Sequence, residues 1–77
     1  MSDSTQGSRI RQAREHAGLS VAELAARVNR SGNTVYRYEW GQFTCSVAML
    51  QSIADNCGVE FTWLATGSGP MKRRGAA

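Results

Sequence analysis

The sequence has few of the residues that build metal sites or disulfide scaffolds. Its 77 residues include two cysteines, Cys45 and Cys57, and one histidine, His16. The cysteines do not form a C-x-x-C pair and His16 is far from both, so the ligand spacing of a zinc site is absent. We therefore expect no metal, and we expect both cysteines to be reduced thiols that pack as small apolar groups.

Long apolar runs and catalytic residue patterns are also missing. No stretch approaches the roughly 20 apolar residues that span a bilayer, and the N-terminus MSDSTQGS is too polar for a signal peptide. Ser20 and Ser31 have no acid–base partners at useful spacing, and there is no phosphate-binding glycine loop. These absences predict a cytoplasmic protein that is not an enzyme, with no membrane contact, no cofactor and no small-molecule ligand.

The excess of positive charge is modest and unevenly placed. The formal net charge is +3, and Lys72, Arg73 and Arg74 lie together near the C-terminus. Residues 8–66 carry six arginines and five acidic residues, so this part of the chain is nearly neutral. Charge alone therefore does not identify a polyanionic partner. The KRR run is either an ordinary solvated end or an arm that follows phosphates.

The periodicity of apolar residues predicts helices and no strands. Capping serines at 20, 31 and 46, and turn-prone residues at 18, 29, 41 and 58, divide the chain. We expect helices at about 5–17, 21–28, 32–39, 47–57 and 60–65. The prediction is a compact all-α bundle of five helices over residues 8–67, with a flexible N-terminal arm at 1–7 and a flexible basic tail at 68–77.

Each predicted helix has one apolar face that we expect to be buried. In the fourth helix, the expected face includes Val47, Leu50 and Ile53. In the fifth helix, Leu64 and either Phe61 or Trp63 point inward. The other residues expected inside are Ile10, Ala13, Arg14, Ala17, Leu24, Ala25, Val28, Val35, Tyr38, Ala54 and Cys57.

The second and third predicted helices have the spacing of a helix-turn-helix motif. The turn between them, residues 29–31, is about three residues long. Asn29 tolerates the positive φ that such a turn needs. Ala25 is small enough for close approach of the two helices, and Val35 supplies an apolar anchor.

Several segments in the right order extend this motif to most of the chain. They are RIRQAREHAGLS, AELAARV, S-x-x-T-V-x-R-x-E-x-G from Ser31 to Gly41, and LQSIADNCGVEFTWLATG. In these segments the sequence resembles the Cro/repressor-type helix-turn-helix family of bacterial and phage transcription regulators. The resemblance implies a lambda-repressor-like domain that binds double-stranded DNA sequence-specifically in the bacterial cytoplasm, at the nucleoid.

The resemblance also implies roles for individual residues. Arg14 matches an arginine that commonly pairs with a glutamate near the end of the third helix, here Glu39. Asn33, Thr34 and Arg37, flanked by Gly32 and Tyr36, match the residues that face base edges in the major groove. Their chemistry agrees, because arginine can pair with guanine, asparagine with adenine, and the Thr34 methyl or Tyr36 ring can meet a thymine methyl.

Phosphate contacts are expected from helix N-termini and loops. The candidates are Ser20, Val21, Arg30, Ser31, Trp40, Gln42 and Thr44. Three positions depart from the family pattern. Gly32 stands where a long polar residue is common. Val21 stands where glutamine is usual, and the absence of the glutamine side chain weakens phosphate binding or requires Arg9, Arg11 and Arg30 to compensate. Trp40 occupies a position that is often polar, so its indole N–H reaches a phosphate or its ring packs near Phe43.

One domain of this size makes too few base contacts for tight binding, so we expect a homodimer on a palindromic operator. Phe61, Trp63 and their neighbours form its expected interface. The short chain and basic tail suggest a Cro-like repressor of a phage or prophage that blocks polymerase. The alternative is a protein-interaction module, such as an antitoxin or adaptor, that uses Tyr36, Tyr38 and Trp40 as its contact surface.

Overall fold

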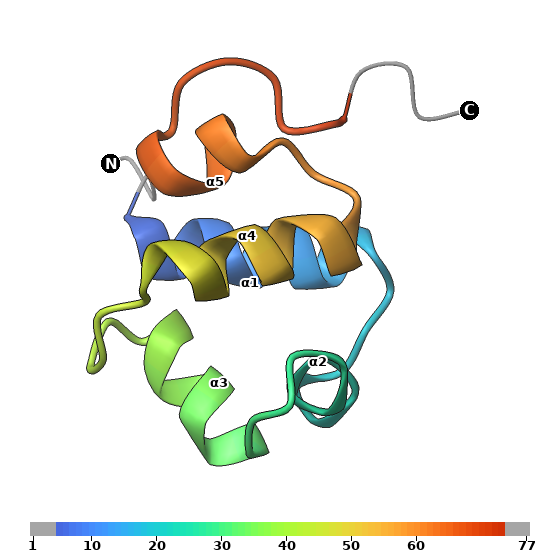
Figure 1. Ribbon diagram of the computed structural model, residues 1–77, viewed down its shortest axis with the longest axis vertical. Coiled ribbons are helices and arrows are strands. Elements are labelled where there is room, and N and C mark those ends of the chain that lie inside the picture. The colour runs from blue at the N-terminus through green and yellow to red at the C-terminus, as the bar shows by residue number, and fades with distance from the viewer. Residues whose placement is uncertain (1–4, 74–77) are drawn as a thin grey trace.

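The computed structural model describes residues 5–73 of the chain and contains five helices. They are α1 (Gln6–His16), α2 (Val21–Arg27), α3 (Gly32–Glu39), α4 (Val47–Cys57) and α5 (Phe61–Thr66). Figure 1 shows α2 and α3 together at one end, with α1 and α4 in the middle and α5 beyond them. The described part has no strand, only an isolated bridge between Val59 and Lys72. The predicted all-α, five-helix fold is confirmed.

The helices begin at the caps that the sequence indicates. Ser20, Ser31 and Ser46 each accept a hydrogen bond from the backbone N–H three residues further on. After α2, Asn29 adopts a φ of 60°, and the N–H groups of Asn29 and Arg30 donate to carbonyl oxygens in the last turn. This left-handed cap ends α2 sharply and turns the chain into α3.

The core is formed by apolar side chains from every helix and from the loop before α5. Its largest fully buried members are Ile10, Leu24, Val35, Ile53, Val59 and Leu64. The expected inward position of Val47 was wrong, because that side chain is 72% exposed. Val47 is the first residue of α4, so its side chain lies at the end of the helix, whereas Ala54, on the same side of the helix two turns further on, is fully buried. Met49 is buried as well.

The folded part begins before the boundary that we expected for the N-terminal arm. Thr5 caps α1, and Gly7 is a buried residue of that helix rather than part of an arm. A Cβ atom at Gly7 would lie 2.7 Å from the carbonyl oxygen of Tyr38. Glycine therefore lets the first turn of α1 contact the backbone at the end of α3. The rest of the expected arm, residues 1–4, lies outside the described residues.

The segment after α5 is packed against the domain, so the expected flexible tail is corrected for residues 68–73. The N–H of Glu60 donates to the carbonyl of Met71 over 2.9 Å, and the Met71 side chain packs on the core. Arg73 donates to Asp55 Oδ1 (3.1 Å) and to the carbonyl of Val59 (2.9 Å). These contacts do not follow the spacing of a helix, so the periodicity of apolar residues did not predict them. Arg74 lies outside the described residues.

Both cysteines are free thiols buried in the domain. Burial raises the pKa of the Cys45 thiol to about 11, so it is protonated at neutral pH. Within residues 5–73, no three side chains of His, Cys, Asp or Glu are grouped as metal ligands. No helix in that range has the length and apolar character needed to cross a membrane.

Candidate nucleic-acid interface

The packing of α3 leaves one of its faces open to solvent. Val35 is fully buried and Tyr38 is half-buried against the core, so these two residues hold the inner side of the helix. Ala25 of α2, 2% exposed, is the small residue expected where the two helices meet. The arrangement is a helix-turn-helix whose second helix has a solvent-facing outer side.

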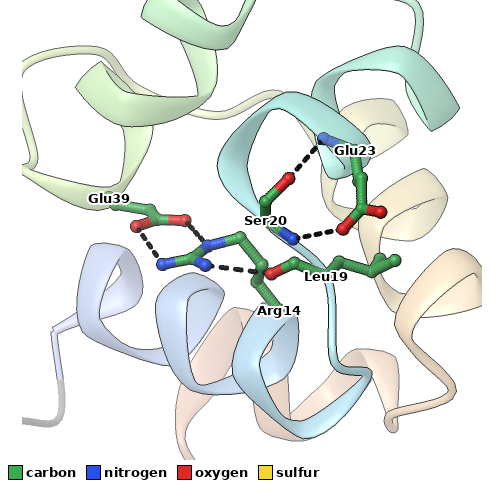
Figure 2. A network of polar contacts seen from close by, with 5 residues as sticks. All are labelled: Arg14, Leu19, Ser20, Glu23 and Glu39. Carbon is green, nitrogen blue, oxygen red and sulfur yellow. Dashed lines mark hydrogen bonds and ion pairs between the residues drawn. The ribbon is translucent and has the colours of Figure 1, made fainter.

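The end of α3 is tied to α1 by an ion pair that is mostly buried (Figure 2). Arg14 Nε donates to Glu39 Oε2 over 2.7 Å and Arg14 Nη2 to Glu39 Oε1 over 3.3 Å. Arg14 Nη1 also donates to the carbonyl of Leu19 in the α1–α2 loop. The hydrogen bond to Glu39 raises the pKa of Arg14. The pair expected from the family resemblance is present, and it fixes α3 relative to α1 and to the start of α2.

The outer face of α3 carries the residues expected to contact bases. Asn33 and Tyr36 are exposed, while Thr34 and Arg37 are half-buried. Residues 33, 36, 37 and 40 follow the i, i+3, i+4, i+7 spacing, so they share one side of the helix. The Thr34 hydroxyl lies 2.9 Å from the Ser31 hydroxyl. Thr34 is therefore engaged in the helix cap.

Aromatic rings support this face at the end of α3. The guanidinium carbon of Arg37 lies 5.3 Å from the centroid of the Phe43 ring. Phe43 in turn packs edge-on against Tyr38, with centroids 6.3 Å apart. The contact between Arg37 and Phe43 was missed from the sequence, although an aromatic residue in the polar loop after α3 was a visible signal. Phe43 orients the side chain of Arg37.

Trp40 is the most exposed aromatic residue of this region, at 63%. Its ring pairs with Tyr36, with centroids 5.8 Å apart and planes tilted by 53°. Of the two expected arrangements, packing near Phe43 is replaced by this contact with Tyr36, one helical turn away. The indole N–H remains a candidate phosphate donor.

The N-terminus of α2 differs from the expectation for Ser20 (Figure 2). The Ser20 N–H donates to Glu23 Oε1 over 2.8 Å, and the Ser20 hydroxyl accepts from the Glu23 N–H over 3.1 Å. The hydrogen bond from the Ser20 backbone lowers the pKa of Glu23, which keeps this carboxylate charged. Ser20 is therefore corrected as a phosphate contact, because its amide is occupied and a negative charge lies beside it.

Two departures from the family pattern lie next to each other. A Cβ atom built on Gly32, at the start of α3, would be 3.8 Å from Val21 Cγ1, at the start of α2. Both residues are half-buried. Their backbone N–H groups belong to the first turns of the helices, where amides have no partner within the helix.

The other expected phosphate contacts lie in the turn before α3 or in the loop after it. Arg30 is exposed, and its guanidinium donates to the carbonyl of Asn29. The Ser31 hydroxyl accepts from the Thr34 N–H, so Ser31 serves as the cap of α3. Gln42 and Thr44 are exposed in the α3–α4 loop. The structure therefore leaves Arg30, Gln42 and Thr44 with exposed side chains.

Arg9 does not extend this surface, contrary to the expectation that it could bind phosphate. It is 7% exposed, and it donates to the carbonyl oxygens of Leu64 (2.9 Å) and Ala65 (3.2 Å). Arg9 therefore joins α1 to the end of α5 and satisfies carbonyl groups that the helix leaves open. Arg11 on the same helix is exposed.

Comparison with known proteins extends these observations to a family. Residues 7–69 match the family described as helix-turn-helix domain. The chain belongs to this family. The match covers all five helices except the first residue of α1, so the helix-turn-helix domain of this chain spans most of the described residues.

A curated relative and a solved structure illustrate the similarity of this helix-turn-helix domain to known proteins. A Pyrobaculum aerophilum protein with the provisional name HTH-type transcriptional regulatory protein is 32% identical over 59 residues, which cover 77% of this chain. The chain spans only 24% of the length of that relative. The crystal structure of the clp gene regulator ClgR from C. glutamicum has a TM-score of 0.73 at 23% identity, covering 78% of each chain. That likeness supports the fold.

The helix-turn-helix domain keeps the residues expected at a dimer interface away from α3. Phe61 and Trp63 lie on α5, which is separated from α3 by α1 and α4 in Figure 1. Both rings are half-buried and pack against the core, while Leu64 is fully buried. Phe61 and Trp63 thus share the inward role that we expected of one of them, and each keeps some exposed surface.

Proposed function

We propose that this chain is a sequence-specific regulator of transcription that binds double-stranded DNA with α3 in the major groove. One observation supports it most strongly. In a helix-turn-helix domain, α3 is anchored on one side by Val35 and Glu39 and presents Asn33, Tyr36 and Arg37 on the other. The provisional name of the Pyrobaculum aerophilum relative, a transcriptional regulatory protein, points the same way.

The outer face of α3 has the chemistry for reading base edges. Arg37 can donate two hydrogen bonds to guanine O6 and N7, and Asn33 can pair with adenine N6 and N7. Packing against Phe43 limits the rotamers of Arg37, which lowers the entropy lost when it binds a base. The exposed Arg30, Gln42 and Thr44 flank this face and contact phosphates.

We further propose a Cro-like repressor that acts as a homodimer in the bacterial cytoplasm, with Phe61 and Trp63 at the interface. The half-buried rings of Phe61 and Trp63 on α5, which keep some exposed surface, support this interface. A symmetric dimer would bind a palindromic operator, with one α3 in each half-site and the half-sites about one turn of DNA apart.

The substitution Arg37→Ala tests the reading role of α3. We expect affinity for a selected duplex to fall by about 1–3 kcal/mol, with relaxed preference at one base pair. Lys72→Ala is the control, since it removes the same charge from an exposed residue outside α3. Binding titrations against a panel of single-base variants separate the two. An Arg37→Ala effect that is equal for every sequence would disprove direct readout.

A protein-interaction module is the second candidate, and the exposed rings favour it. Trp40 is 63%, Tyr36 51% and Phe43 45% exposed, and aromatic residues are enriched at protein interfaces. Salt separates the two functions. Affinity for DNA falls steeply as salt rises, by a slope of about 0.9 per phosphate contact in a double-logarithmic plot. Binding of a protein through these rings would be nearly independent of salt.

A further inference from the structure

An open apolar spot lies where the N-termini of α2 and α3 meet. We consider the position that a Cβ atom of Gly32 would take, and leave aside Gly32 itself and its close neighbours along the chain. Among the described residues, one heavy atom then lies within 4 Å of that position, Val21 Cγ1 at 3.8 Å. Gly32 is not among the residues with positive φ, so its backbone does not require glycine. The fold would accept a side chain here, and the missing one leaves the Val21 methyl group uncovered on that side.

This spot lies at the end of α3 from which bases are read. Asn33, the next residue, is exposed on the reading face. Val21 is β-branched, so its methyl groups have few rotamers and keep a fixed position. Its side chain has no hydrogen-bonding group, so it offers a DNA base only an apolar contact.

We propose that Val21 and Gly32 form the contact site for the C5-methyl group of a thymine, so that this pair of residues determines specificity. In the major groove, thymine is distinguished by that methyl group, which apolar side chains recognise. The absent side chain at Gly32 admits the methyl group, and Val21 Cγ1 supplies the surface against which it packs. This inference rests on the proposed DNA-binding function.

The other apolar candidates on this face are less free to take that role. The Thr34 side chain is held by the Ser31 hydroxyl, 2.9 Å away. The Tyr36 ring packs on Trp40, one turn further along the helix. Val21 at the start of α2 and Gly32 at the start of α3 therefore provide the apolar contact.

Replacing each thymine of a selected duplex in turn by deoxyuridine removes only the methyl group and leaves pairing unchanged. We expect one thymine in each half-site to be sensitive, with affinity falling about fourfold, the factor that corresponds to burial of one methyl group. A cytosine placed at that position should bind more tightly when it carries a 5-methyl group. The other thymines of the duplex serve as internal controls.

Two variants identify the residues responsible. Gly32→Ala adds a methyl group with ordinary van der Waals clearance, so the domain should fold, and thymine should lose its advantage over uracil. Thr34→Ser is the matched control, since it removes the methyl group of the competing reader while keeping the hydroxyl that bonds Ser31. In that variant, the fourfold preference for thymine should remain.

Three results would overturn the inference. If the preference for thymine persists in Gly32→Ala and disappears in Thr34→Ser, Thr34 is the reader. If the duplex binds tightly and no thymine is sensitive to uracil, the methyl contact does not exist, while the proposed function stands. If no duplex binds at all, the proposed function fails, and this inference fails with it.

Discussion

The ion pair between Arg14 and Glu39 allows an estimate of how much the Glu39 side chain contributes to the free energy of unfolding, and this estimate can be tested. The two side chains are 14% and 4% exposed, and the arginine makes two hydrogen bonds to the carboxylate. In Glu39→Ala, the guanidinium loses its counter-charge while it stays close to the protein. We therefore expect the variant to fold less stably, because a desolvated charge without a partner is costly.

The structure sets the expected size of this loss. Removing one partner of a fully buried pair costs about 3–5 kcal/mol. Arg14 keeps its bond to the Leu19 carbonyl and retains some access to water, which lowers the expectation to about 2–3 kcal/mol. For a domain of this size, 1 kcal/mol corresponds to roughly 4–8 °C in Tm, so Glu39→Ala should melt about 10–20 °C lower.

Thermal unfolding followed by circular dichroism measures this change, and Asp55→Ala is the matched control. Asp55 also pairs with an arginine, Arg73, but its side chain is 56% exposed, so its loss should cost below about 1 kcal/mol. A double variant with Arg14→Met and Glu39→Leu should recover stability, because it strands no charge. Equal melting temperatures for Glu39→Ala and wild type would refute the reasoning.

Three further outcomes follow from contacts elsewhere in the domain. Gly7→Ala should lower the free energy of unfolding by about 1–3 kcal/mol in denaturant titrations, because its Cβ would lie 2.7 Å from the carbonyl oxygen of Tyr38. Gly32→Ala should be tolerated, and equal effects of the two substitutions would contradict the close contact at Gly7. The pKa of Glu23 is lowered in the folded state. The ionised carboxylate therefore stabilises the fold above pH 4.5, and this stabilisation is lost as the pH falls through the lowered pKa. The gap in unfolding free energy between wild type and Glu23→Gln should thus close on acidification, and a pH-independent gap would show that ionisation is irrelevant. Cys45, with a pKa of about 11, should react with alkylating agents far more slowly in the folded protein than in denaturant, and equal rates would mean that it is accessible.

The limits of helices were predictable from sequence where local signals define them. Ser31 caps α3 and Gly41 follows it, and the predicted range of 32–39 is the observed one. Asn29 took the left-handed conformation because few other residues tolerate it. Such features depend on neighbours within a few residues, so a single sequence contains the information.

Contacts between distant residues were not predictable in this way. Gly7 contacts backbone about 30 residues away, and Arg73 reaches Asp55 18 residues away. Arg9 was expected to compensate for Val21 by binding phosphate, but it lies beside Ile10 on the buried side of α1. The position of Arg9 next to the apolar stripe of α1 was the available signal that its guanidinium could cap the end of α5.

The candidate site was predictable in outline from the spacing of α3. The period of the helix separates Val35 from Asn33, Tyr36 and Arg37, and the structure keeps that separation. Ser20 was expected to contact phosphate, but its amide is occupied by the carboxylate of Glu23 in the capping box. The support of Arg37 by Phe43 depends on the path of a loop, which no periodicity describes.

Selection of bound sites from a pool of random DNA duplexes tests the central claim most directly. The account predicts enrichment of a palindromic motif whose half-sites are about one helical turn apart, with a guanine whose preference is lost in Arg37→Ala. Absence of any enriched motif, at a salt concentration low enough for phosphate contacts to hold, would contradict the claim that α3 reads DNA.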